Sequence, residues 1–165
     1  MSYILIENLD DLEYLDSELL KLPYVALDTE FRRTNKDNMR LALMQINDGE
    51  EIYLIDAVSI KDPLGRCNFL SSKSVVKIIH SCKEDLESIF SWTGAGINNI
   101  FDTQIANAFL DGLFSVGYQG LVQEYLGLDI NKTETRSNWL RRPLTNSQLD
   151  YAASDVEFLL DLFIY

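Results

Sequence analysis

"VALDTEF", residues 25–31, determines how this chain folds. Its apolar start is typical of a buried strand. Alternate residues of a strand face the same side, so Asp28 and Glu30 project together and Thr29 projects to the other face. Two carboxylates this close repel each other unless a cation neutralises them. The pair therefore predicts either a solvated strand end or a site for a hard, oxygen-bound cation such as Mg²⁺ or Mn²⁺.

The overall composition is that of an ordinary globular chain. It has 165 residues, 47% of them hydrophobic, which favours a single domain over residues 1–165 with a sizeable core. No apolar run approaches the ~20 residues that cross a bilayer, and the acidic start does not resemble a signal peptide. Cys67 and Cys82 are too far apart in sequence for a close-spaced metal pair. We therefore expect reduced thiols in a cytoplasmic protein that does not bind a membrane.

The net charge of −12 argues against broad attraction to nucleic acid, which basic surfaces provide. The charge is uneven, however. Residues 31–40 hold Arg32, Arg33, Lys36 and Arg40 against one acid, and residues 131–142 are similarly basic. These segments are either two solvated loops or local binding sites for a polyanion.

The order of predicted elements favours an α/β fold with a central mixed β-sheet flanked by α-helices. Strands come first, as a probable antiparallel meander, and strand–helix alternation follows. Asn8 or Asp10 is predicted to cap the first helix and Thr145 a long final helix that runs to the end. The predicted strands are 4–7, 24–31, 41–47, 51–57, 74–80 and 98–102, and the other predicted helices are 83–90, 103–112 and 118–127.

Three further residues complete a pattern with the first acidic pair. Tyr151 and Asp155 are four residues apart on the final helix and so share one face. Asp85 lies in the first turn of a helix that directly follows a buried strand. Each feature has an ordinary explanation alone: a Tyr–Asp surface contact, and an acid at a helix N-terminus. These separate explanations do not account for the order and spacing of all three features along the chain.

The order of D-x-E on a strand, an Asp opening a middle helix and Y-x-x-x-D on a late helix resembles the DEDD family of 3′→5′ exonucleases, in its tyrosine subclass. The sibling subclass has a histidine where this chain has Asp150. The resemblance extends from about residue 2 to 165 and is greatest to the catalytic domain of bacterial ribonuclease D. It is carried by "ALDTEF", "LALMQI", "HSCKEDLE", "FDTQIANAF" and "KTETRSNWLRRPLTNSQLDYAASDVEFL".

This resemblance implies a ribonuclease H-like fold and an activity. The family removes nucleoside 5′-monophosphates one at a time from the 3′ end of single-stranded RNA, and transfer-RNA precursors are its suggested substrate. Ribonuclease D continues into two small helical nucleic-acid-binding domains, and we expect these to be absent from this chain. The sequence indicates no protein partner.

The resemblance also implies roles for the site residues, with two divalent ions, Mg²⁺ or Mn²⁺, as cofactors. Asp28 would bridge both ions. Glu30 and Asp155 would complete the site of the ion that generates the nucleophile, and Asp85 would hold the ion next to the leaving group. Tyr151, whose ordinary pKa of about 10 makes it a poor base, would orient the attacking water.

Substrate contacts are expected from side chains around these acids. Lys132 and Arg136 could hold phosphates, and Phe31 could contact the terminal nucleotide or belong to the core. His80, which ends a buried strand, is expected to be structural or to contact ribose. Asp102 is expected to cap the helix that follows it.

Three other functions fit part of the pattern. The first is a DNA exonuclease, because the acids act on phosphate alone. The second is a catalytically inactive nucleic-acid-binding domain, although all five site residues are present. The third is a D-x-D-type phosphatase, which would leave Tyr151 and Asp155 unexplained.

Overall fold

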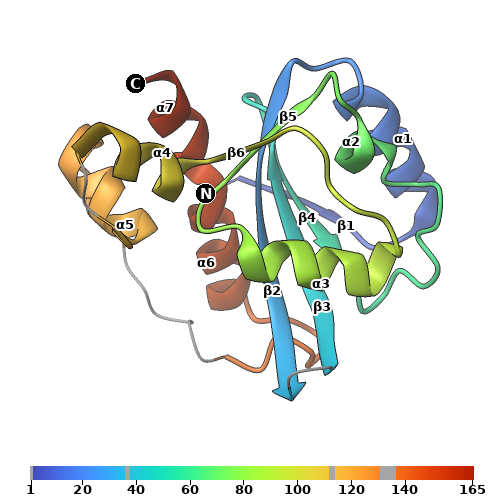
Figure 1. Cartoon of the computed structure of the whole chain (residues 1–165). Coiled ribbons are helices and arrows are strands. Elements are labelled where there is room, and N and C mark those ends of the chain that lie inside the picture. The colour runs from blue at the N-terminus through green and yellow to red at the C-terminus, as the bar shows by residue number, and fades with distance from the viewer. Residues whose placement is uncertain (1, 36–37, 112–113, 131–136) are drawn as a thin grey trace.

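A mixed six-stranded sheet in the order β1-β4-β3-β2-β5-β6 forms the centre of the molecule (Figure 1). The structure is a computed structural model that describes residues 2–35, 38–111, 114–130 and 137–165. The predicted antiparallel meander is confirmed as β2, β3 and β4, and β1, β5 and β6 join it in parallel. The strands are β1 (Ile4–Ile6), β2 (Tyr24–Asn35), β3 (Asn38–Asn47), β4 (Ile52–Asp56), β5 (Val76–Ile79) and β6 (Ile100–Asp102).

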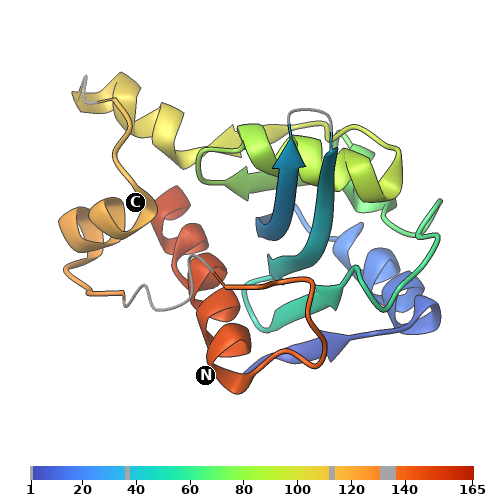
Figure 2. The same cartoon turned by 90° about the horizontal axis from the view of Figure 1, so that it is seen from below.

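Helices cover both faces of the sheet, as predicted. Helices α1, α2 and α3 pack on one face, and α5, η1, α6 and α7 pack on the other. Figure 2, seen from below, shows the same two layers on either side of the strands. The helices are α1 (Leu9–Leu19), α2 (Asn68–Ser71), α3 (Lys83–Thr93), α4 (Thr103–Asp111), α5 (Tyr118–Leu121), the π-helical turn η1 (Val122–Leu126), α6 (Asn146–Glu157) and α7 (Leu159–Ile164).

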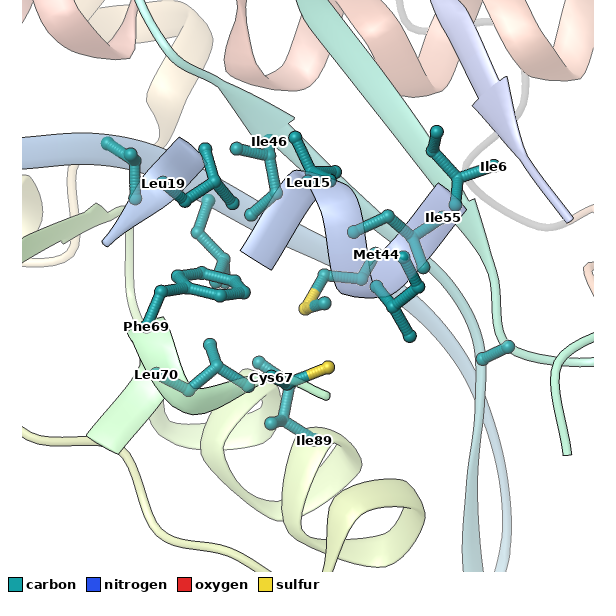
Figure 3. Packing of buried hydrophobic residues seen from close by; sticks show 14 of the residues in the cluster. Ile6, Leu15, Leu19, Met44, Ile46, Ile55, Cys67, Phe69, Leu70 and Ile89 are labelled. Atoms are coloured by element: carbon teal, nitrogen blue, oxygen red, sulfur yellow. The ribbon is translucent and has the colours of Figure 1, made fainter. Parts of the chain in front are cut away.

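The core under α1 follows directly from the sequence pattern. The side chain of Asn8 caps α1 by accepting the Asp11 N–H at 2.9 Å, which confirms the predicted helix start. Apolar residues on one helix face, including Leu15 and Leu19, are buried against the sheet. Figure 3 shows them packed with Phe69 and with residues of β3, β4 and α3. This layer fixes one side of β2.

The hairpin formed by β2 and β3 is longer than the sequence predicted. Pairing continues through the basic segment 31–40 as far as Asn35 opposite Asn38. The described residues of the first basic segment, 31–35 and 38–40, therefore form an arm of the sheet. Alternating hydrophobicity does not predict this arm because both of its faces carry polar side chains.

A β-bulge interrupts this hairpin beside the D-x-E pair. The register changes from Glu30 opposite Leu43 to Phe31 opposite Leu41, so Ala42 is an extra residue on β3. The extra residue reverses the alternation. Leu43 therefore belongs to the core under α6, and Leu41 belongs to the core under α1 and α3.

The expectation of one long final helix is wrong. The helix breaks at Phe158, whose φ and ψ are −108° and 7°, and continues as α7. Side chains from elsewhere satisfy the backbone at the break. Asn47 on β3 donates to the Val156 carbonyl oxygen at 3.1 Å, and the Tyr118 hydroxyl accepts the Phe158 N–H at 3.0 Å. Tertiary hydrogen bonds thus favour the break over a continuous helix.

Other differences from the sequence prediction are small. Helix α2 was not predicted, and the predicted helix 118–127 changes from α-helical to π-helical partway before it ends at Gly127. The predicted stop of α4 at Gly112 lies outside the described residues. Among the described residues, none of the helices is long and apolar enough to cross a membrane.

Candidate active site

The acids meet where β2 separates from β5. These parallel strands pair only along Tyr24–Ala26, so the β2 edge at Asp28 has no strand beside it. The chain leaves β5, turns at Ser81 with a φ of 60°, and enters α3, which packs on β2 and β3. Figure 1 shows α3 crossing beside β2 and β3. Asp85 lies in the first turn of α3 and hydrogen-bonds to Thr29 of β2. Ligands commonly bind at such a separation of parallel strands.

Thr29 connects the D-x-E pair to Asp85. As the alternation predicts, the buried Thr29 side chain faces α3, on the other side of β2 from Asp28 and Glu30. Its hydroxyl donates to Asp85 Oδ1 at 2.5 Å and lies 3.0 Å from Ser88 Oγ. The middle residue of the D-x-E motif therefore positions the acid of α3.

Helix α6 contributes Tyr151 and Asp155 from the other side of the sheet. Its start is fixed by a reciprocal capping box between Thr145 and Gln148, as the predicted cap requires. Tyr151 is 8% exposed, and its ring lies 5.9 Å from that of Trp139. Asp155 follows one turn later and is partly exposed.

The pKa values of the carboxyl groups show that they share one electrostatic site. Burial raises the pKa of Asp28 well above its ordinary value, and the negative charges of Asp85, Asp155 and Glu30 raise it further. Burial, followed by the charges of Asp155 and Asp85, raises the pKa of Glu30 to about 9. Burial raises the pKa of Asp85 to about 6, although the hydrogen bond from Thr29 opposes it. The structure thus brings together the acids that the sequence predicts.

The Tyr151 hydroxyl lies in the same field. Burial raises its pKa, and the negative charges of Asp155 and Glu30 add to this effect. The hydroxyl also hydrogen-bonds to Asp155, which stabilises its protonated form. The arrangement makes Tyr151 a hydrogen-bond donor and not a base near neutral pH.

The donor set fits a hard divalent cation. All the acidic side chains offer oxygen, the donor that Mg²⁺ and Mn²⁺ prefer, and their mutual repulsion would be relieved by positive charge. In the described part of the chain, no three histidine, cysteine, aspartate or glutamate side chains already converge as metal ligands. The carboxylates are near enough to raise one another's pKa, but in the described residues no three of them converge on a common metal position.

Phe31 lies in a position where it could touch a substrate. It is partly exposed and lines a hollow of about 330 Å³ together with Arg32, Ser137, Asn138 and Trp139. Trp139 packs on Tyr151, so this hollow adjoins the acidic site. Phe31 is therefore not fully enclosed in the core.

The other predicted substrate residues differ in their surroundings. His80 is half-buried, and its Nδ1 lies 2.9 Å from Thr103 Oγ1. Asp102 caps α4 as predicted, since Oδ1 accepts the Gln104 N–H at 2.9 Å. Lys132 and Arg136 lie outside the described residues.

The sequence did not predict the ion pair that fixes the loop before α6. Asp56, 2% exposed, accepts hydrogen bonds at 2.7 Å from both Nε and Nη2 of Arg142. The same guanidinium donates to the carbonyl oxygens of Trp139 and of the bulge residue Ala42. These partners are far apart in sequence, and no local motif connects them. The ion pair holds the Trp139 loop against the sheet and so supports Tyr151.

Comparison with known proteins identifies the family of the chain. A model of the 3′-5′ exonuclease family matches residues 3–165. The chain belongs to the 3′-5′ exonuclease family. Among its relatives in that family, ribonuclease D of Pseudomonas paraeruginosa is 44% identical over 142 residues, which are 86% of this chain and 38% of the relative.

Solved structures of other exonucleases show the same fold. The crystal structure of Escherichia coli ribonuclease D matches with a TM-score of 0.93 and 39% identity, covering 99% of this chain and 44% of that one. The predicted ribonuclease H-like fold and the resemblance to the ribonuclease D catalytic domain are confirmed. This chain spans less than half the length of these ribonuclease D relatives.

A third relative was solved with a metal ion. Brucella melitensis NrnC with bound Mg²⁺ matches with a TM-score of 0.79 and 26% identity, covering 98% of this chain and 78% of NrnC. Its Mg²⁺ is the ion type that the oxygen donor set of this chain would prefer.

Proposed function

We propose that residues 1–165 form a single catalytic domain that removes nucleoside 5′-monophosphates from the 3′ end of single-stranded RNA. The observation that carries this proposal is the shared electrostatic site of Asp28, Glu30 and Asp85 with Tyr151 and Asp155. Exonuclease family membership over nearly the whole chain supports the reaction type. Similarity to ribonuclease D supports RNA over DNA as the substrate.

Four carboxylates would hold two divalent ions, Mg²⁺ or Mn²⁺. Asp28 is the central ligand in this proposal, because the charges of Asp85, Asp155 and Glu30 all act on it. Such ions, when bound, neutralise charge on the reacting phosphate and lower the pKa of a coordinated water. We assign Glu30 and Asp155 to the ion on the nucleophile side and Asp85 to the ion on the leaving-group side.

The remaining side chains of the site bind the RNA or orient the attacking water. Tyr151 orients the nucleophilic water through a hydrogen bond of its hydroxyl group, which stays protonated because burial raises its pKa. Phe31 stacks on the terminal nucleotide from the hollow beside Trp139. His80 contacts ribose or holds α4 through Thr103. Lys132 and Arg136 bind substrate phosphates, as the resemblance implies.

The natural substrate and location are further parts of the proposal. The family resemblance suggests transfer-RNA precursors, and Brucella melitensis NrnC has been solved bound to pGG. A cytoplasmic location is consistent with Cys67 and Cys82, both free thiols.

Degradation of labelled oligonucleotides tests the function. A 5′-labelled RNA with a single-stranded 3′ end should give a ladder of products, each shorter by one nucleotide, that requires Mg²⁺ or Mn²⁺ and stops with a chelator. The matched DNA should be cut more slowly, and Asp155→Asn should abolish the ladder while the fold survives. Equal rates on DNA would reassign the substrate. Binding of RNA without any cleavage would favour an inactive binding domain.

A further inference from the structure

Gln45 is a buried side chain beside the acidic site, and both of its amide atoms lack a hydrogen-bond partner in the described part of the chain. It is 0% exposed, and the two atoms concerned are Nε2 and Oε1. A buried amide without partners is costly, and most such groups in native proteins have a partner in some functional state. The "LALMQI" segment that holds Gln45 was part of the family resemblance but received no role.

The strand register places Gln45 directly beside Asp28. Gln45 on β3 is paired with Asp28 on β2 and with Leu54 on β4. Paired residues of neighbouring strands face the same side, with Cβ atoms about 4.5–5.5 Å apart. Both side chains therefore project toward α6, the side on which Ala26 and Leu54 are buried.

Three other neighbours on this face offer the amide no partner. Leu43 and Leu54 are apolar, and the Asn47 side chain is committed to the Val156 carbonyl oxygen and the Gly49 N–H. Of the two residues directly paired with Gln45 in the sheet, Asp28 and Leu54, Asp28 is the one with a suitable acceptor.

We infer that Gln45 is a positioning residue for the nuclease site, whose amide Nε2–H donates to the Asp28 carboxylate when that carboxylate binds a divalent cation. The hydrogen bond fixes the rotamer of Asp28 and directs its remaining oxygen lone pairs toward the ion. Partners that orient metal ligands in this way typically change metal affinity or activity by about 10–100-fold when removed. This inference rests on the proposed function of the acidic site.

The direct test observes Gln45 in the wild-type protein. The side-chain amide resonance of Gln45, identified by its loss in Gln45→Met, should shift and saturate as Mg²⁺ is added. No shift over a titration that saturates the site would overturn the inference.

Calorimetric titration of Mn²⁺ supplies a second readout. Gln45→Met keeps the length of the side chain and removes the amide, and it should lower Mn²⁺ affinity about 10-fold or more. It should also lower kcat while the KM for RNA stays unchanged. Leu54→Met is the matched control, because it changes packing at the other neighbour of Gln45 without touching Asp28.

The outcomes separate this inference from the proposed function. If wild type binds Mn²⁺ and cuts RNA but Gln45→Met matches Leu54→Met in both, Gln45 has only a packing role and the inference fails. If wild type neither binds Mn²⁺ nor cuts RNA, the proposed function fails first. If Gln45→Met alone loses affinity while its melting temperature stays at or above that of wild type, positioning is supported and simple destabilisation is excluded.

Discussion

At the scale of single residues, the Tyr151 hydroxyl is the group that distinguishes this site from a plain carboxylate cluster. Burial and the charges of Asp155, Glu30 and Asp28 raise its pKa, so the hydroxyl stays protonated and donates a hydrogen bond. Tyr151→Phe should slow the chemical step by about 10²–10³, the size of losing one positioned donor in a transition state. Single-turnover kinetics measure this step, and Mn²⁺ titration should show unchanged metal affinity because the carboxylates remain.

A tyrosine outside the site provides the control. The Tyr125 hydroxyl hydrogen-bonds to Asn107 Oδ1 at 2.8 Å, away from the acids. Tyr125→Phe removes a comparable hydrogen bond and should leave the chemical rate unchanged. If Tyr151→Phe behaves like this control, the tyrosine is only part of the helix face.

Asp28→Asn should have opposite effects on activity and on stability. The substitution removes the ligand that we propose to bridge the two ions and should abolish cleavage, because a neutral amide does not replace its charge. In the presence of a chelator it also relieves repulsion from Asp85, Asp155 and Glu30. We expect the melting temperature of the metal-free protein to rise by about 2–4 °C, the shift that ~1 kcal/mol makes in a chain of this size. Scanning calorimetry with a chelator would contradict this if the variant melts below wild type.

The sequence patterns predicted which acidic residues share a face, but not the neighbouring side chains that contact them. The two-residue strand period gave the common face of Asp28 and Glu30, and the four-residue helix spacing gave that of Tyr151 and Asp155. The hydrogen bond from Thr29 to Asp85 and the buried amide of Gln45 depend on pairing between distant segments. Local periodicity carries no information on such pairings.

At the scale of secondary-structure elements, the ion pair of Asp56 and Arg142 joins β4 to the loop before α6. Burial raises the pKa of Asp56, but hydrogen bonds from Arg142 and Ser59, together with the charge of Arg142, outweigh it and hold the pKa below its ordinary value. A carboxyl whose folded pKa is lowered contributes stability above its unfolded pKa and loses that contribution as pH falls through the folded pKa.

We therefore expect Asp56→Asn to destabilise the protein in a pH-dependent way. At neutral pH the loss of unfolding free energy should lie near the lower end of the about 3–5 kcal/mol typical of a broken buried pair, since Arg142 is 21% exposed. The difference from wild type should shrink below about pH 4. Urea unfolding across pH measures it.

An exposed ion pair serves as the control for this effect. The pair of Glu13 and Arg66 lies at the surface, with side chains 65% and 37% exposed. Glu13→Gln should change the unfolding free energy by less than about 1 kcal/mol at any pH. An Asp56→Asn effect that does not shrink in acid would mean that packing, and not charge, dominates there.

Two features of the elements were beyond sequence reasoning for the same physical reason. The bulge at Ala42 has no glycine or other local signal, and the Arg142 side chain satisfies the Ala42 carbonyl oxygen at 2.9 Å. The break at Phe158 is likewise stabilised by Asn47 and Tyr118. The antiparallel meander and the starts of α1 and α6, in contrast, follow from strand patterns and from the caps at Asn8 and Thr145, which are local.

At the scale of the whole molecule, charge limits how strongly RNA can bind. The chain carries a net charge of −12, and Arg33 in the basic arm is already paired with Glu84 and Glu87. The protein can therefore neutralise few RNA phosphates at once. For single strands, each neutralised phosphate adds about −0.7 to the slope of log affinity against log salt concentration.

We expect a shallow salt dependence and distributive cleavage. The slope for single-stranded RNA should be smaller in magnitude than about 3, and this chain alone should release structured RNA after few cuts. Fluorescence titration at several salt concentrations and a cold-RNA chase measure the two quantities. A steeper slope, or long uninterrupted degradation at physiological salt, would contradict this account.

Strand β2 lies at the centre of the sheet, and this position determines which element of the acidic site can separate without unfolding of the whole domain. Strand β2 is hydrogen-bonded on both edges near Ala26 and covered on both faces, so its amide hydrogens there should exchange with solvent mainly through global unfolding. Helix α6 is joined to the sheet by side chains, so its amides can exchange when it undocks alone. Mild denaturant should therefore separate Asp155 from Asp28 and inactivate the protein at concentrations that leave β2 protected, as exchange followed by mass spectrometry would reveal.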